Sequence, residues 1–208
     1  GRGKVRAMHE IIWHGRGGQG VVLAAQILAE SAYIQGFRGV TSAPTFGPER
    51  RGAPLTASTR ISDEPIRTFS QIASADIAVI LDESLLKAAT GAGRIKKGGL
   101  VIVNTTLTPE QIETNGNFSV ATVEAAGIAW EHHLSMSGVP VVNTPLLGAL
   151  SMASGLISLE NIEKGIKKKM SPSKASFNFQ AIRTAFERTL YVRSEEQLET
   201  QEKNEDEK

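Results

Sequence analysis

The sequence predicts an α/β fold: a Rossmann-like, open and mostly parallel sheet flanked by helices, with a helical C-terminal end. Three observations predict this fold class. A glycine turn joins a short strand to an apolar helix near the amino end, two later strands are continuous apolar runs, and helix starts marked by serine, threonine or proline follow one another toward the carboxyl end. Strands that alternate with helices are typical of a parallel sheet with helical layers.

The expected strands are short and end at turn-forming residues. Residues 9–13 lead into the glycine turn, and further strands are expected at 37–42, 55–61, 77–81 and 100–103. The last two are apolar without polar alternation, which indicates strands that are buried on both faces of the sheet.

The expected helices are marked by their periodicity and their caps. Residues 21–33 place apolar side chains at spacings of three and four, the pattern of one buried helix face. A short helical segment is expected at 84–92, and Thr108, Pro109 and Gln111 fit a capping-box start. Three later helix starts are Thr144-Pro145, before a helix that ends at Gly155, then Ser158, and then Ser171-Pro172. The last helix is expected to carry the apolar stripe Ala175, Phe179, Ile182, Phe186 and Leu190.

We expect one domain over residues 1–193 and an acidic tail over residues 194–208. The tail carries a charge of −5, which leaves +6 on the body of a chain whose net charge is +1. A segment with so few apolar side chains cannot bury enough surface to offset its ordering entropy, so we expect disorder or a fraying helix end.

Composition also argues against several classes of protein and site. The chain has no cysteine, which excludes disulfides, thiolate metal sites and any iron–sulfur cluster held by its own cysteines. No apolar run is long enough to cross a bilayer and the amino end lacks a signal-like stretch, so we expect a cytoplasmic protein without a membrane partner. The body is only mildly basic, with few aromatic side chains between its arginines, so no nucleic-acid partner is expected.

The glycine turn is the first candidate binding element. Its residues are Gly15, Arg16, Gly17, Gly18, Gln19 and Gly20, and three of the glycines fit G-x-G-x-x-G between a strand and a helix. Glycine lets the backbone approach a phosphate closely, and a helix N-terminus offers N–H groups and partial positive charge. A dinucleotide site also wants an acid after the second strand, where residues 40–43 have none. The turn therefore binds another phosphate-bearing group or only packs tightly.

The second candidate element is the loop over residues 47–54, which holds two arginines between turn-forming residues. The guanidinium groups of Arg50 and Arg51 are suited to carboxylates and phosphates, so they are candidates to bind an anionic ligand or an acidic partner surface. An internal salt bridge to Glu49 or Glu64 is the alternative.

Polar residues at the expected carboxyl edge of the sheet complete the candidate site. Asn104 follows a buried strand, Asn143 and Thr144 precede a proline-initiated helix, and Asp82 follows another strand. Helix capping explains Asp82 and Thr144 without a ligand. We find no metal-ligand pattern and no nucleophile with its base, so no residue is assigned a catalytic role.

Six stretches, taken in order, resemble the gamma subunit or gamma domain of the 2-oxoacid:ferredoxin oxidoreductases. The resemblance spans about residues 10–188. The matching stretches are residues 13–20, 46–54, 60–66, 82–86, 103–105 and 143–149.

The resemblance implies an accessory subunit of an enzyme that oxidatively decarboxylates a 2-oxo acid to an acyl-coenzyme A and passes electrons to ferredoxin or another acceptor. It implies that thiamine diphosphate, magnesium and iron–sulfur clusters belong to other subunits, and that this chain packs against them and contacts coenzyme A. The stretch 47–54 looks nearer to the pyruvate and branched-chain type, and an aryl 2-oxo acid remains open. The alternatives are a free-standing NAD(P)-binding oxidoreductase and a ligand-free interaction scaffold.

Overall fold

The computed structural model describes residues 8–44 and 49–206. These residues form a seven-stranded sheet in the order β2-β3-β1-β4-β5-β6-β9. The strands are β1 (Met8–Arg16), β2 (Gly39–Pro44), β3 (Pro54–Ser62), β4 (Ala75–Ile80), β5 (Ile95–Asn104), β6 (Ser119–Val123) and β9 (Leu190–Val192). A small hairpin of β7 (Ser135–Met136) and β8 (Val139–Pro140) stands apart from this sheet.

The centre of the sheet is parallel, as expected, and antiparallel strands flank it. Strands β1, β4, β5 and β6 pair in parallel, whereas β3 pairs antiparallel with both β1 and β2, and β9 pairs antiparallel with β6. The neighbour of β1 on that side is therefore β3 and not the strand that follows the first helix. This arrangement differs from a dinucleotide-binding unit, in which the second strand lies parallel beside the first.

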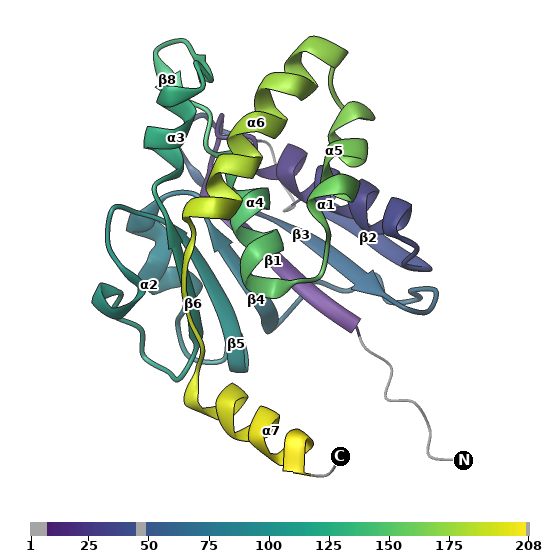
Figure 1. Ribbon diagram of the computed structural model, residues 1–208, viewed down its shortest axis with the longest axis vertical. Coiled ribbons are helices and arrows are strands. Elements are labelled where there is room, and N and C mark those ends of the chain that lie inside the picture. The colour runs from purple at the N-terminus through teal and green to yellow at the C-terminus, as the bar shows by residue number, and fades with distance from the viewer. Residues whose placement is uncertain (1–7, 45–48, 207–208) are drawn as a thin grey trace.

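Helices cover the two faces of the sheet unequally (Figure 1). The helical elements are α1 (Val21–Gln35), η1 (Glu83–Leu85), α2 (Leu86–Ala89), η2 (Pro109–Gln111), α3 (Ala125–Glu131), α4 (Asn143–Ser154), α5 (Leu159–Lys167), α6 (Pro172–Arg188) and α7 (Glu195–Asp206). The main core joins the sheet to α1, α3, α4, α5 and α6, while a smaller core on the other face joins β4 and β5 to η1 and α2.

Trp13 and Ile11 of β1 show how the pattern of the first strand builds the main core. Both side chains are fully buried, and they pack with Leu28 of α1 and Leu147 of α4 in one cluster. Burial of one such side chain contributes about 1.5–3 kcal/mol. Because alternate residues of a strand point to opposite faces, His14 lies on the other side of the sheet.

Several element boundaries differ from expectation. Leu190 lies in β9, because α6 ends at Arg188 and the chain turns back to pair with β6. Helix α4 begins at Asn143 with Val142 at the N-cap, so Thr144 does not cap it. The expected start at Thr108 is confirmed by the hydrogen bond from its amide to Gln111 Oε1 at 3.0 Å, although the element is a short 3-10 helix.

The acidic tail is not confirmed as a disordered segment. Residues Glu195–Asp206 form helix α7, which projects from the end of the sheet in Figure 1. Glutamate, glutamine and lysine are good helix formers, so local propensity supports a helix without burial of apolar surface. Ser194, which the sequence assigned to the tail, is 3% exposed and its amide donates to Ser119 Oγ at 2.9 Å. The domain boundary at residue 193 stays a prediction.

Candidate functional site

The fold brings the glycine turn and the arginine loop into direct contact. Gly17 and Arg51 form an isolated parallel bridge, in which the Gly17 amide donates to Ala53 O at 2.9 Å and the Gly52 amide donates to Gly17 O at 3.0 Å. A Cβ atom at Gly17 would lie 2.0 Å from the carbonyl oxygen of Arg50. Glycine is therefore needed at this position because the loop backbone occupies the space of a side chain.

Internal partners already occupy several amides of the turn. The Gly18 amide donates to Glu49 Oε1 at 3.0 Å, the Gln19 amide donates to Arg16 O at 3.1 Å, and the Arg16 amide donates to Gln19 Oε1 at 2.7 Å. The Glu49 carboxylate thus lies where an anionic ligand would meet the Gly18 amide. The first two residues of the expected loop, Gly47 and Pro48, lie outside the described residues.

The N-terminus of α1 has the features of an anion site. Gly20 occupies the N-cap position with φ 76°, no side chain caps the helix, and its first turn carries no acidic residue. A helix end of this kind presents unpaired N–H groups and roughly half a positive charge. An anion bound there completes the hydrogen bonds of the first turn.

Asn143 lies against the same helix end with one polar atom unused. Its Nδ2 donates to Gly20 O at 3.2 Å, and a Cβ atom at Gly20 would lie 2.4 Å from that nitrogen. The residue is only 4% exposed, and its Oδ1 has no hydrogen-bond partner among residues 8–44 and 49–206. A buried acceptor without a donor costs about 1–3 kcal/mol, which favours a ligand that supplies an N–H or O–H group.

The Arg16 side chain connects the glycine turn to the arginine loop and to the start of η1. Its guanidinium donates to Asp82 Oδ2 at 2.9 Å, to Gly52 O at 3.1 Å and to Ser84 Oγ at 2.9 Å. Hydrogen bonding from Ser84, followed by that from Arg16, lowers the pKa of the Asp82 carboxyl group. Asp82 also accepts from the Ser84 amide at 3.0 Å, so it caps η1 as the sequence suggested.

The side chains of Arg50 and Arg51 are exposed beside the turn. Neither has a carboxylate partner among the residues that the structure describes, because Glu49 binds the Gly18 amide instead. The internal salt bridge that the sequence left open is therefore not seen within the described part of the chain. Both guanidinium groups can meet an anion.

Asn104 and Thr144 have structural partners instead. Asn104 donates to Leu81 O and accepts from the Ala125 amide, each at 3.0 Å, and so ties the ends of β4 and β5 to α3. Thr144 is completely buried and its hydroxyl donates to Asn178 Oδ1 at 2.6 Å. Their predicted role as ligand contacts is untested, and we leave them out of the proposed site.

His14, which follows Trp13 into the turn, is buried and uncharged. Burial, followed by the positive charge of Arg94, lowers its pKa to about 4. The imidazole is therefore neutral at neutral pH. Its position inside the sheet could not be read from the sequence, because the apolar pattern of β1 breaks at this residue.

The described residues contain neither a metal-binding cluster nor a membrane-spanning helix. No group of three histidine, aspartate or glutamate side chains lies close enough to hold a metal ion. None of the helices over residues 8–44 and 49–206 has the length and apolar character to span a membrane.

A known protein family matches most of the chain. The family model described as pyruvate ferredoxin/flavodoxin oxidoreductase matches residues 10–188. The chain is 45% identical over 186 residues to the pyruvate/ketoisovalerate oxidoreductases common subunit gamma of Thermococcus litoralis. This alignment covers 88% of this chain and 98% of the relative. It is 44% identical over 160 residues to pyruvate synthase subunit PorC of Methanosarcina barkeri, covering 77% and 85%.

Solved structures share the fold. The pyruvate oxidoreductase subunit PORC of Thermotoga maritima superimposes with a TM-score of 0.75 at 35% identity, covering 89% of this chain and 98% of that chain. The 2-oxoglutarate:ferredoxin oxidoreductase of Magnetococcus marinus, solved with 2-oxoglutarate, coenzyme A and succinyl-CoA bound, gives a TM-score of 0.65 at 18% identity. It covers 88% of this chain and 31% of that chain, and at this identity the likeness concerns the fold alone.

Proposed function

Because the chain belongs to the pyruvate ferredoxin/flavodoxin oxidoreductase family, we propose that it is the gamma subunit of a multi-subunit 2-oxoacid:acceptor oxidoreductase. That enzyme decarboxylates a 2-oxo acid oxidatively to an acyl-coenzyme A and passes the electrons to ferredoxin or another acceptor. The observation that carries the proposal is 45% identity to a gamma subunit over 98% of its length.

The chain's part in this enzyme is structural and substrate-binding. It has no cysteine to hold a cluster, and its sequence has neither a G-x-S-x-G nor an H-E-x-x-H motif. We assign thiamine diphosphate, magnesium and the iron–sulfur clusters to the companion subunits, as the family resemblance implies. An accessory role of this kind needs a surface for those subunits and a place for the acyl acceptor.

Coenzyme A is the ligand that best fits the glycine turn and its surroundings. Its phosphates suit the uncapped N-terminus of α1 and the exposed guanidinium groups of Arg50 and Arg51. Its hydroxyl and amide groups are donors that can satisfy the unpaired Oδ1 of Asn143. The Glu49 Oε1 lies 3.0 Å from the Gly18 amide nitrogen. A bound phosphate takes the place of this carboxylate.

Reconstitution tests the proposal. The companion subunits, expressed together with and without this chain, are assayed for coenzyme A-dependent oxidation of pyruvate and of branched-chain 2-oxo acids. We expect acyl-coenzyme A formation only in the complete complex, and no activity from the isolated chain. Full activity of the isolated chain, or of the companion subunits without it, contradicts the proposal.

The free-standing NAD(P)-binding alternative is disfavoured by topology. Strand β3 runs antiparallel beside β1, and residues 40–43 provide no acid for a ribose. That alternative predicts tight NAD(P)H binding to the isolated chain, which fluorescence titration measures directly.

A further inference from the structure

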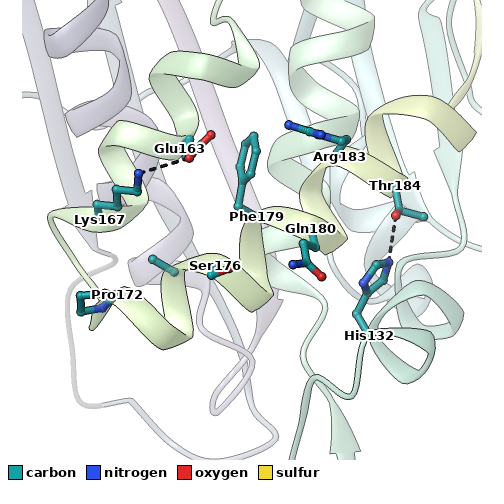
Figure 2. Close-up of a pocket in the computed structure, with 10 residues that line it drawn as sticks. His132, Glu163, Lys167, Pro172, Ser176, Phe179, Gln180, Arg183 and Thr184 are labelled. Atoms are coloured by element: carbon teal, nitrogen blue, oxygen red, sulfur yellow. Dashed lines mark hydrogen bonds and ion pairs between the residues drawn. The ribbon is translucent and has the colours of Figure 1, made fainter.

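A cavity lies far along the chain from the glycine turn and shares no residue with it. It has a volume of about 520 Å³ and opens between α5, α6 and the end of α3. Figure 2 shows Ser176, Phe179 and Gln180 of α6 between Lys167 of α5 on one side and His132 on the other. Nothing in the proposed coenzyme A site accounts for this groove.

One face of α6 forms the long side of the groove. Ser176, Phe179, Gln180 and Arg183 recur at spacings of three and four, so they form one stripe on the helix. The stripe extends for about 10 Å at a rise of 1.5 Å per residue. A length of this kind suits a short peptide segment laid along the helix.

Phe179 and Arg183 combine a flat apolar surface with a positive charge. Phe179 is only 8% exposed, and the Arg183 guanidinium carbon lies 5.2 Å from the centre of its ring. Stacking of this type limits the freedom of the guanidinium while its N–H donors remain available. The Arg183 side chain is exposed, and it has no carboxylate partner among the described residues.

The groove has an excess of positive charge. Lys167 is neutralised by Glu163, whose carboxylate lies 3.2 Å from its Nζ, and the Nε2 of His132 lies 2.8 Å from Thr184 Oγ1. Among the described residues that line the groove, Arg183 therefore carries a positive charge without a carboxylate partner. Lys168 and Lys169 follow directly after α5, are exposed, and have no carboxylate partner within residues 8–44 and 49–206.

We propose that this groove docks an acidic segment of a companion subunit, with a carboxylate of that segment bound by Arg183 and a neighbouring side chain packed on Phe179. The inference rests on the proposed function, since it requires the multi-subunit assembly. Charge complementarity selects the occupant, because a guanidinium held in place binds a carboxylate through two parallel N–H···O bonds. The unpaired lysines that follow α5 favour further acidic residues in the same segment.

The test compares two matched charge reversals in the assembled complex. Arg183→Glu places a negative charge in the groove, whereas Arg38→Glu makes the same change at an exposed arginine outside it. We expect Arg183→Glu to weaken association with the companion subunits by about tenfold or more, the loss expected for a charge-assisted hydrogen bond. Arg38→Glu should stay within about threefold of the wild type. Arg183→Lys keeps the charge but loses the second parallel hydrogen bond and the stacking on Phe179, so its association should fall between those of Arg38→Glu and Arg183→Glu. Circular dichroism of each isolated chain confirms that it is folded.

A cross-link identifies the occupant. Ser176→Cys gives a single thiol in a chain that has no cysteine, so a photoreactive group can be attached inside the groove of the assembled complex. We expect it to capture an acidic peptide of a companion subunit. Association of Arg183→Glu equal to that of the wild type overturns the proposal, as does a cross-link to the α7 helix of a second copy or to a segment without acidic residues. Failure of the wild-type chain itself to assemble contradicts the proposed function, and this inference falls with it.

Discussion

The Gly18 amide donates a hydrogen bond to Glu49 Oε1 at 3.0 Å, so a carboxylate of the chain itself occupies the anion position of the glycine turn. Arg50 and Arg51 follow Glu49 directly and have exposed side chains. An anionic ligand that meets the Gly18 amide must therefore displace Glu49. We expect Glu49→Gln to remove a competing charge and to lower the KM for coenzyme A by about two- to fivefold, equivalent to about 0.4–1 kcal/mol.

Steady-state kinetics of the reconstituted complex measures this change. Glu110→Gln is the control, since it removes an exposed carboxylate in η2, outside the site. A higher KM for coenzyme A in Glu49→Gln means instead that Glu49 helps to hold the ligand.

Arg50→Ala and Arg51→Ala test the guanidinium groups of the arginine loop. We expect each to raise the KM for coenzyme A by about tenfold or more, because a lost charged hydrogen bond costs about 1.5–3 kcal/mol. The KM for the 2-oxo acid and decarboxylation without coenzyme A should change little, as in the control Arg38→Ala. If the two variants dissociate the complex and leave coenzyme A kinetics unchanged in what remains, the arginines are interface residues.

Gly17→Ala tests the close approach of the loop to the turn. The added Cβ atom would lie 2.0 Å from Arg50 O, so the loop must shift, and we expect a loss of about 1–3 kcal/mol in the free energy of unfolding. Gly91→Ala is the matched control, because the nearest atom to its added Cβ lies 3.6 Å away. Urea denaturation compares the two. Equal stability of both variants means that the loop moves away at little cost.

The buried imidazole of His14 makes stability depend on pH. Its pKa is about 4 in the folded chain and 6.5 in the unfolded chain, so the unfolded state binds more protons between these values. The free energy of unfolding should therefore rise by up to about 3 kcal/mol from pH 4 to pH 6.5, with the contribution complete above pH 6.5. Urea denaturation across this range should show a weaker pH dependence in His14→Gln than in the wild type.

Two truncations define where the tail begins. Removal of residues 196–208 should leave the free energy of unfolding within about 0.5 kcal/mol of the full chain, because the α7 side chains that the structure describes are exposed. Removal of residues 194–208 should cost about 1 kcal/mol more, since it deletes the buried hydrogen bond from Ser194 to Ser119 Oγ. If the two truncated chains have equal midpoints in thermal or urea unfolding, the boundary between the domain and the tail lies at residue 193, as the sequence suggested.

Local pattern was sufficient for most elements but not for those with short or broken patterns. The apolar periodicity of residues 21–33 and the serine caps at Ser158 and Ser171 predicted α1, α5 and α6 correctly. Strand β6 and helix α3 were missed. Strand β6 has five residues and helix α3 has seven, too few for a clear periodic pattern. The strand is stabilised by pairing with β5, and the helix by packing against α6.

The sequence by itself determined the fold class and the list of candidate site residues, because glycines, prolines and apolar periodicity act through local backbone geometry. The family resemblance rested on six matching stretches in order. Only the tertiary structure decided which candidates meet. It brought Gly17 against Arg51 and Asn143 against Gly20, and it gave Asn104 and Thr144 internal partners. Hydrogen bonds between residues far apart in the chain depend on strand order and helix packing, which no local pattern encodes, so the pairing of Glu49 with the Gly18 amide could be seen only in the folded chain.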